Sequence, residues 1–164
     1  MLSFFWLNSV EGGTVTSIEF SLPDKQCFVG NKQASAVVKF TPSILLATGG
    51  VITLTYPAGF FAPVAPVVIT GGAVTISAAA PNPAMNVILL TVTAGSITGS
   101  VQFTMTLSGL TITKIPTGSV ESIRVTTSAD SGLPQGVSTG ALVTHLLYEF
   151  AIVCIYMYIF RKLL

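Results

Sequence analysis

The stretch Val101–Leu107 reads VQFTMTL and alternates apolar with polar side chains along its length. Successive side chains of an extended strand point to opposite faces, so this alternation gives the strand one apolar and one polar face. The apolar face holds Val101, Phe103, Met105 and Leu107, and the polar face holds Gln102, Thr104 and Thr106. A strand of this kind buries one side and leaves the other in water, which is typical of antiparallel sheets that share a core.

The same period of two recurs between Thr14 and Thr127, where Val, Ile, Leu and Phe alternate with Thr and Ser. β-Branched residues suit a pleated surface and resist helix formation. The pattern predicts strands near Thr14–Phe20, Ala34–Phe40, Val51–Tyr56, Val67–Thr70, Ala73–Ala78, Val87–Thr93, Ser100–Leu107, Thr111–Ile115 and Ser122–Thr127. Short strands at this spacing predict an all-β fold, either an antiparallel sandwich or a barrel.

Turn-forming residues separate the predicted strands. Gly71-Gly72 fits a two-residue hairpin, because primed turns require positive φ. The Pro-rich segment Tyr56–Pro66 cannot be a central strand, and we interpret it as a long connection at one end of the fold. Phe60 and Phe61 are expected to plug that end of the core. Because adjacent residues of a strand cannot both point inward, Tyr56, Phe60 and Phe61 also form the candidate contact surface.

The composition excludes several classes of protein. The chain has 164 residues, of which 51% are hydrophobic and 8% are charged, and its formal net charge is +1. Disordered chains combine low hydrophobicity with high net charge, so this chain is expected to fold. Seven basic residues against six acidic ones cannot neutralise a run of phosphates, so we expect no nucleic-acid partner.

No motif predicts a reaction centre. One histidine and two cysteines, Cys27 and Cys154, do not make a zinc site, and no disulfide is expected between them. The sequence contains neither a nucleophile elbow nor a phosphate-binding loop. We expect Asp24 and Asp130 to be solvated carboxylates in polar turns. We therefore expect a protein that is not an enzyme and has no catalytic residue, no cofactor and no metal.

The C-terminal run Ala141–Phe160 reads ALVTHLLYEFAIVCIYMYIF, and the basic residues Arg161 and Lys162 follow it. About 20 apolar residues cross the hydrocarbon core of a bilayer, so residues 141–160 are predicted to form a single transmembrane helix and 161–164 a basic cytoplasmic tail. An interfacial helix is the alternative. His145 and Glu149 lie four residues apart and would share one helix face, which is a candidate polar face for contact with another helix. Residues 1–13 are expected to be a leader that makes a poor signal peptide, and residues 128–140 are expected to be a Ser/Gly/Pro linker.

Three stretches together carry a resemblance to a known family. They are LTYPAGFF at Leu54–Phe61, VQFTMTLSGL at Val101–Leu110 and SIRVTTSAD at Ser122–Asp130. They resemble the Thr/Gly-rich, Ig-like β-sandwich repeats of large, mostly uncharacterised surface proteins of unicellular eukaryotes. The resemblance covers about Thr14–Gly140, one repeat. It implies an Ig-like sandwich with an extracellular structural or adhesive role, and it supplies no catalytic residue.

The sequence thus leads to one functional hypothesis and two alternatives. The first is a membrane-anchored surface module with a structural, adhesive or protein-interaction role, whose β-domain is extracellular or lumenal and whose partner is a protein or a glycan. A tail-anchored chain with a cytosolic domain is the topological alternative. The functional alternatives are a subunit of a larger membrane or capsid-like assembly and a carbohydrate-binding module.

Overall fold

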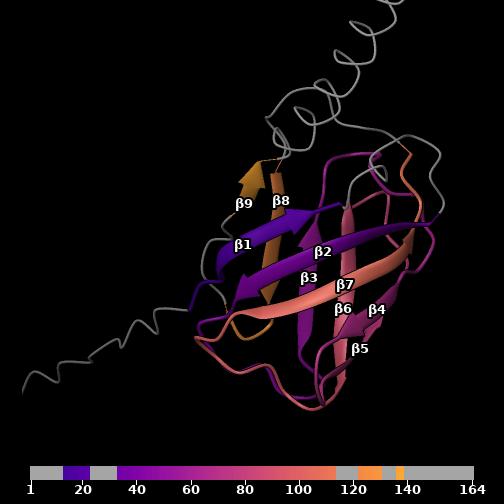
Figure 1. The fold of residues 1–164 in the computed structure, drawn as a ribbon. Coiled ribbons are helices and arrows are strands. Elements are labelled where there is room, and N and C mark those ends of the chain that lie inside the picture. Colours follow the sequence, from indigo (N-terminus) through magenta and orange to yellow (C-terminus); the bar gives the residue numbers. More distant parts are fainter. Residues whose placement is uncertain (1–12, 23–32, 114–121, 131–135, 139–164) are drawn as a thin grey trace, which may run out of the picture.

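The computed structural model describes residues 13–22, 33–113, 122–130 and 136–138. These residues form nine strands in two sheets (Figure 1). The first sheet has the order β1-β2-β7-β4, made of β1 (Thr16–Ser21), β2 (Ala34–Thr41), β7 (Phe103–Leu110) and β4 (Val67–Thr70). The second has the order β5-β6-β3-β8-β9, made of β5 (Thr75–Ala78), β6 (Val87–Ala94), β3 (Val51–Thr55), β8 (Ser122–Thr127) and β9 (Gly136–Ser138).

All neighbouring strands pair antiparallel, and the two sheets lie face to face. The side chains between the sheets make one hydrophobic cluster. On β2, every second residue is fully buried, from Ala34 to Phe40, and the residues between them are half-buried. Burial of each large aliphatic side chain stabilises the fold by about 1.5–3 kcal/mol. The apolar residues of the predicted alternation therefore form the core of a two-layer β-sandwich.

The two ends of the sandwich are distinct. Thr55, the last residue of β3, pairs with Arg124, near the start of β8, while Ile52 pairs with Thr127. Ser138, the last residue of β9, pairs with Ser122. We call the end where β3 and β9 finish the exit end. The opposite end, where residues 42–50, 95–102 and 128–130 connect the strands, is called the loop end.

Most predicted strand boundaries lie within one or two residues of the structure, and the larger differences are in two places. β7 begins at Phe103 rather than Ser100 and continues to Leu110, so Val101 precedes the strand and is exposed. In the predicted strand Thr111–Ile115, the described residues 111–113 contain one isolated bridge, between Ile112 and Phe61. These residues pair with the connecting segment after Tyr56, through hydrogen bonds from the Ala62 amide to the Thr111 carbonyl and from the Thr113 amide to the Phe60 carbonyl, and the pairing is limited to this one bridge.

The hairpin predicted at Gly71-Gly72 is wrong. Gly72 does have positive φ, but β4 and β5 belong to different sheets. The turn carries the chain from one layer to the other, and the Thr70 hydroxyl donates to the carbonyl of Val74 across it. Val68 and Ile76 then pack against the shared core from opposite sheets. Both arrangements need the same turn residues and the same alternation, so the sequence did not distinguish them.

The range 128–140, predicted to be a linker, contains strand β9, which extends the second sheet beyond Thr127. The predicted leader 1–13 and transmembrane helix 141–160 lie outside the described residues, except for Gly13. In the ranges that the structure describes, no helix is long and apolar enough to cross a bilayer.

Candidate interaction surface

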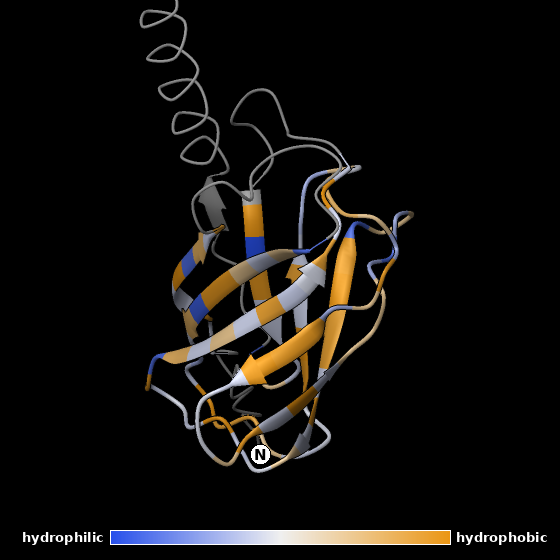
Figure 2. Ribbon diagram, turned by 45° about the vertical axis from the view of Figure 1, so that its right-hand side comes forward, coloured by the Kyte–Doolittle hydropathy of each residue, from blue (hydrophilic) through white to orange (hydrophobic). Residues whose placement is uncertain are grey.

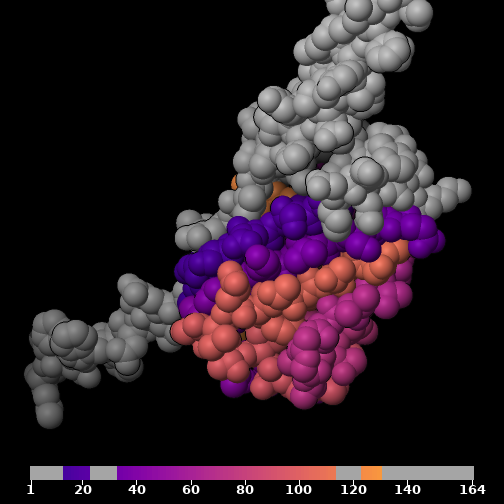
Figure 3. Space-filling view, viewed as in Figure 1, coloured from indigo at the N-terminus to yellow at the C-terminus, as the bar shows by residue number. Residues whose placement is uncertain are grey.

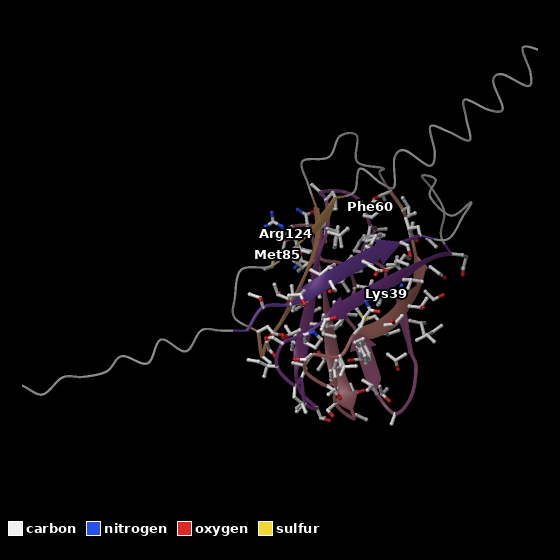
Figure 4. All side chains as sticks on the ribbon, turned by 60° about the vertical axis from the view of Figure 1, so that its left-hand side comes forward. Lys39, Phe60, Met85 and Arg124 are labelled. Carbon is white, nitrogen blue, oxygen red and sulfur yellow. The ribbon has the colours of Figure 1, made fainter. Side chains whose placement is uncertain are left out.

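Charge is nearly absent from the sandwich. Among the described residues, the charged side chains are Glu19, Lys39, Arg124 and Asp130. Glu19 and Lys39 form a salt bridge of 2.8 Å on the outer face of the first sheet. Asp130 is buried, and Arg124 points away from the sheets (Figure 4). Such a surface has little long-range attraction for charged ligands.

Large apolar side chains occupy part of the surface instead. Those exposed in the described residues are Ile44, Leu45, Val64, Val67, Ile69, Met85, Leu89 and Val101. Single exposed apolar residues are common on proteins, whereas a cluster of them marks a contact site. Two clusters stand out, one on β4 and one at the loop end.

The first cluster is the outer side of β4, which we call the β4 edge and define as Val67–Thr70. Val67 is 66% exposed and Ile69 is 56% exposed, while Val68 points inward and packs against the core. The strand is hydrophobic along most of its length and lies at the surface (Figures 2 and 3). Among the described strands, β4 pairs with β7 alone, so its other side is an open sheet edge.

The edges formed by β1 and β5 differ from the β4 edge. The pairing of β1 with β2 shifts between Thr16 and Glu19, and Ser17 has a φ of 49°. The pairing of β5 with β6 shifts between Thr75 and Ile76. Bulges and charges of this kind discourage pairing with another chain. The register of β4 against β7 is regular from Val67 to Thr70, and neither feature protects it.

The second cluster lies at the loop end, where Ile44, Leu45 and Val101 are 44%, 52% and 55% exposed. The connections that carry them are joined by a hydrogen bond from the Ser100 amide to the Pro42 carbonyl, 2.7 Å. A Cβ on Gly99 would lie 2.8 Å from the Ser43 carbonyl oxygen, so the two backbones touch there.

Asp130 holds this end together. Its carboxylate accepts hydrogen bonds from the Ser43 hydroxyl, the Ile44 amide (3.2 Å) and the Thr127 hydroxyl (2.9 Å). The Asp130 amide donates in turn to the Thr127 hydroxyl, 3.0 Å. We expected Asp130 to be solvated, but it is 3% exposed and is a structural acceptor. The sequence did carry one signal of this role. Thr127 stands three residues before Asp130, and Thr and Asp side chains at such spacings often form local hydrogen bonds with nearby backbone groups.

The predicted contact residues are in the core. Tyr56 is 3% exposed, and Phe60 and Phe61 are each 2% exposed. The Phe60 and Phe61 rings lie 4.3 Å apart, and the Tyr56 and Phe61 rings lie 5.2 Å apart. These side chains therefore plug the exit end, as one interpretation of the sequence had it, and do not form an exposed contact surface.

The reason is that Phe60 does not lie in a strand. Its amide donates to the Pro57 carbonyl at 3.1 Å, and Gly59 in this turn has a φ of 72°. The turn directs both adjacent rings inward, and Figure 4 shows where Phe60 lies. The Tyr56 hydroxyl donates to the Asn82 carbonyl at 3.3 Å, and burial raises the pKa of this hydroxyl.

The other predicted site residues, His145 and Glu149, lie outside the described residues. Within the described ranges, no group of three or more His, Cys, Asp or Glu side chains is placed to hold a metal ion. The surface features that remain for function are the β4 edge and the loop end.

No protein-family model matches the chain, and no curated protein matches it. Among solved structures, the chain is similar to the crystal structure of BslA, described as a bacterial hydrophobin. The two share 15% sequence identity with a TM-score of 0.41, over 79% of this chain and 95% of the other. A likeness this remote carries no argument about function.

Proposed function

We propose that this chain is a non-enzymatic, membrane-anchored surface module with an Ig-like fold, and that it works by structural or adhesive contact with other proteins. The observation that carries the proposal is the exposure of large aliphatic side chains on a sandwich that has few charges. Val67 and Ile69 expose more than half of their surface beside an open sheet edge. Exposure of aliphatic side chains to water raises the free energy of the protein, and contact with a partner removes this cost.

The number of strands in each sheet is the feature that supports the Ig-like part of the proposal. One sheet has four strands and the other five, all antiparallel. Variable-type immunoglobulin domains also divide nine antiparallel strands between sheets of four and five. The connection between the sheets differs, because β4 lies in the four-stranded sheet and β6 in the five-stranded sheet, whereas the fourth and sixth strands of a variable-type domain have the opposite placement.

The position of the exit end supports the anchored arrangement. β9 finishes at Ser138 on the exit end, and the apolar run that we propose as the anchor begins at Ala141. An anchor attached there leaves the loop end and the sides of the sandwich available for contact. We place the β-domain on the extracellular or lumenal side, because Arg161 and Lys162 follow the apolar run and basic residues favour the cytoplasm.

Thiol labelling of intact cells tests this topology. In a chain with Cys27 and Cys154 replaced by serine, Ser77→Cys gives one exposed thiol on β5, and Ile76→Cys gives a matched thiol that is buried. An impermeant maleimide is expected to label Ser77→Cys on intact cells and to leave Ile76→Cys unlabelled. Labelling of Ser77→Cys only after permeabilisation would contradict the outside orientation and favour the tail-anchored alternative.

The second candidate function is a subunit of a larger assembly. It is favoured by the low charge of the outer faces, where Thr106 on β7 faces outward opposite Ile69. Purification in a mild detergent separates the two candidates. A protein that can be isolated without other subunits supports the surface module, and an obligate complex with other subunits supports the assembly.

A further inference from the structure

We propose that the β4 edge pairs antiparallel with the β4 edge of a second copy of this chain, and that the pair joins copies anchored in opposing membranes. This inference rests on the proposed function and names its partner. It is carried by the regular pairing and exposed aliphatic side chains of the edge, by the lack of charge on it, and by the end of the sandwich at which β9 finishes.

The β4 edge is ready to accept a strand. It is regular over its whole length, lacks a bulge and exposes two β-branched aliphatic residues. Sheet edges that bind other strands use backbone hydrogen bonds for affinity and alternate side chains for specificity. The bulges on β1 and β5 make those two edges worse templates.

The edge is complementary to itself. Residues directly opposite one another in an antiparallel pair share a face of the sheet. With Val68 opposite Val68 of the second copy, Val67 of each copy faces Ile69 of the other on the outer side. Both contacts occur twice, as a two-fold axis requires, and they join the most exposed aliphatic residues of the strand.

The charge distribution also favours a second copy. In a two-fold contact each group meets the same surface of its partner, so charges near the axis repel. Neither β4 nor its neighbour β7 carries a charge. The opposite edge of the same sheet carries Glu19, salt-bridged to Lys39. The β4 edge is therefore the side of this sheet on which two copies meet without like-charge repulsion.

The exit ends of the two copies then face in opposite directions. The two-fold axis of an antiparallel strand pair stands perpendicular to the sheet, and a half-turn about it reverses every direction in the plane of the sheet. Because β9 runs within the second layer and finishes at the exit end, the exit ends of the two copies lie on opposite sides of the pair. This geometry suits copies on facing membranes rather than neighbours in one membrane.

The contact is small for a stable dimer in solution. Four residues a side fall well below the roughly 800 Å² per partner of a standard interface. Many copies on two facing membranes act together, so avidity compensates for a weak single contact. The test therefore uses the full chain in vesicles rather than in dilute solution.

The experiment mixes two populations of phosphatidylcholine vesicles with different dyes, both carrying the full chain, and measures two-colour clusters. Flotation first checks that the chain stays with the vesicles. Ile69→Lys places a charge on the exposed face of β4, and Leu89→Lys adds the same charge at an exposed position on β6. We expect the wild type and Leu89→Lys to cluster, and Ile69→Lys to fall to the level of protein-free vesicles.

A complementary pair tests the register. Vesicles with Ile69→Lys are mixed with vesicles carrying Val67→Glu, because the proposed register places position 67 of one copy opposite position 69 of the other. We expect each variant alone to fail and the mixture to cluster, whereas Ile69→Lys mixed with Leu89→Glu stays dispersed. In a chain with Cys27 and Cys154 replaced by serine, Val68→Cys is expected to form a disulfide between copies in clustered vesicles, because opposite Cα atoms lie about 4.5–5.5 Å apart.

Each alternative outcome has a definite meaning. Clustering by Ile69→Lys at the wild-type level, or wild-type vesicles that float with the protein but do not cluster, overturns this inference and leaves the proposed function standing. A chain that does not float with the vesicles overturns both. If the charged variants fail to fold by circular dichroism, Val68→Cys decides, and no disulfide between copies overturns the inference.

Discussion

Asp130 is the residue on which the loop end depends. Three donors, from Ser43, Ile44 and Thr127, converge on one buried carboxylate. A buried donor that loses its acceptor costs about 1–3 kcal/mol. The residue links β8 to the connection after β2, which are far apart in the sequence, so its removal acts on the tertiary fold rather than on one turn.

We expect Asp130→Ala to lower the free energy of unfolding by about 1–3 kcal/mol, because the buried Thr127 hydroxyl loses its acceptor, whereas the exposed Ser43 and Ile44 donors can bond to water. Asp130→Asn keeps one acceptor oxygen and should cost less. Chemical unfolding of the full chain in detergent, followed by circular dichroism, measures both. Ser77→Ala, at an exposed position, is the control. Equal stability of Asp130→Ala and the wild type would contradict the assigned role.

Because of Tyr56, the stability of the fold depends on pH in the alkaline range. Burial raises the pKa of its hydroxyl above the ordinary value of 10.0, which the residue regains on unfolding. The folded state therefore holds the proton more tightly, and stability falls as pH rises above 10. We expect Tyr56→Phe to reduce this fall, and to cost no more than about 1 kcal/mol at neutral pH through the lost bond to Asn82. The free energy of unfolding of the wild type and Tyr56→Phe, measured at neutral pH and above pH 10, checks this. The same fall with pH in both proteins would contradict the prediction.

At the scale of the elements, two connections cross at the loop end where Gly99 meets the backbone of Ser43–Leu45. A Cβ at Gly99 would lie 2.8 Å from the Ser43 carbonyl oxygen and 3.0 Å from the Leu45 amide nitrogen. Backbone cannot rotate away as the end of a side chain can. A methyl group added at Gly99 would therefore push the two connections apart.

We expect Gly99→Ala to lower the free energy of unfolding by about 1–3 kcal/mol through overpacking. The matched control is Gly71→Ala, because a Cβ there meets nothing within 4 Å. That substitution should be neutral or stabilise by up to about 1 kcal/mol through reduced freedom of the unfolded chain. Thermal unfolding of both variants compares them directly, and equal effects would show that the crossing is looser than the structure indicates.

At the scale of the whole molecule, the described surface carries few charges and several exposed apolar side chains. Exposed charges interact over about 10 Å at 0.1 M salt, and higher salt screens them. The β4 edge holds no charge for salt to screen. Its association should therefore respond to apolar burial rather than to ionic strength.

We expect vesicle clustering to change less than about twofold between 0.05 and 0.5 M sodium chloride, since few charges are there to screen. Ammonium sulfate should strengthen it, because excluded salts favour apolar burial. The mixture of Ile69→Lys with Val67→Glu vesicles is the internal control, and its clustering should weaken as sodium chloride rises. A steep loss of wild-type clustering in sodium chloride would indicate that charges hold the contact.

The local pattern of the sequence determined that the described part of the chain is built from strands, and which side chains of those strands point toward the core. Met105 and Leu107 point inward and Thr104 and Thr106 outward, as their alternation predicts, because pleated backbone fixes the direction of each side chain without reference to the rest of the chain.

Tertiary structure decided the rest. The turn at Gly71-Gly72 joins two sheets, Phe60 and Phe61 both point inward, and Asp130 is buried by groups distant in sequence. The exposed β4 edge follows from the order of the strands, since a strand of the same sequence in the middle of a sheet would have been covered on both sides. Pairing and burial depend on which distant segments meet, and that is a property of the folded chain as a whole.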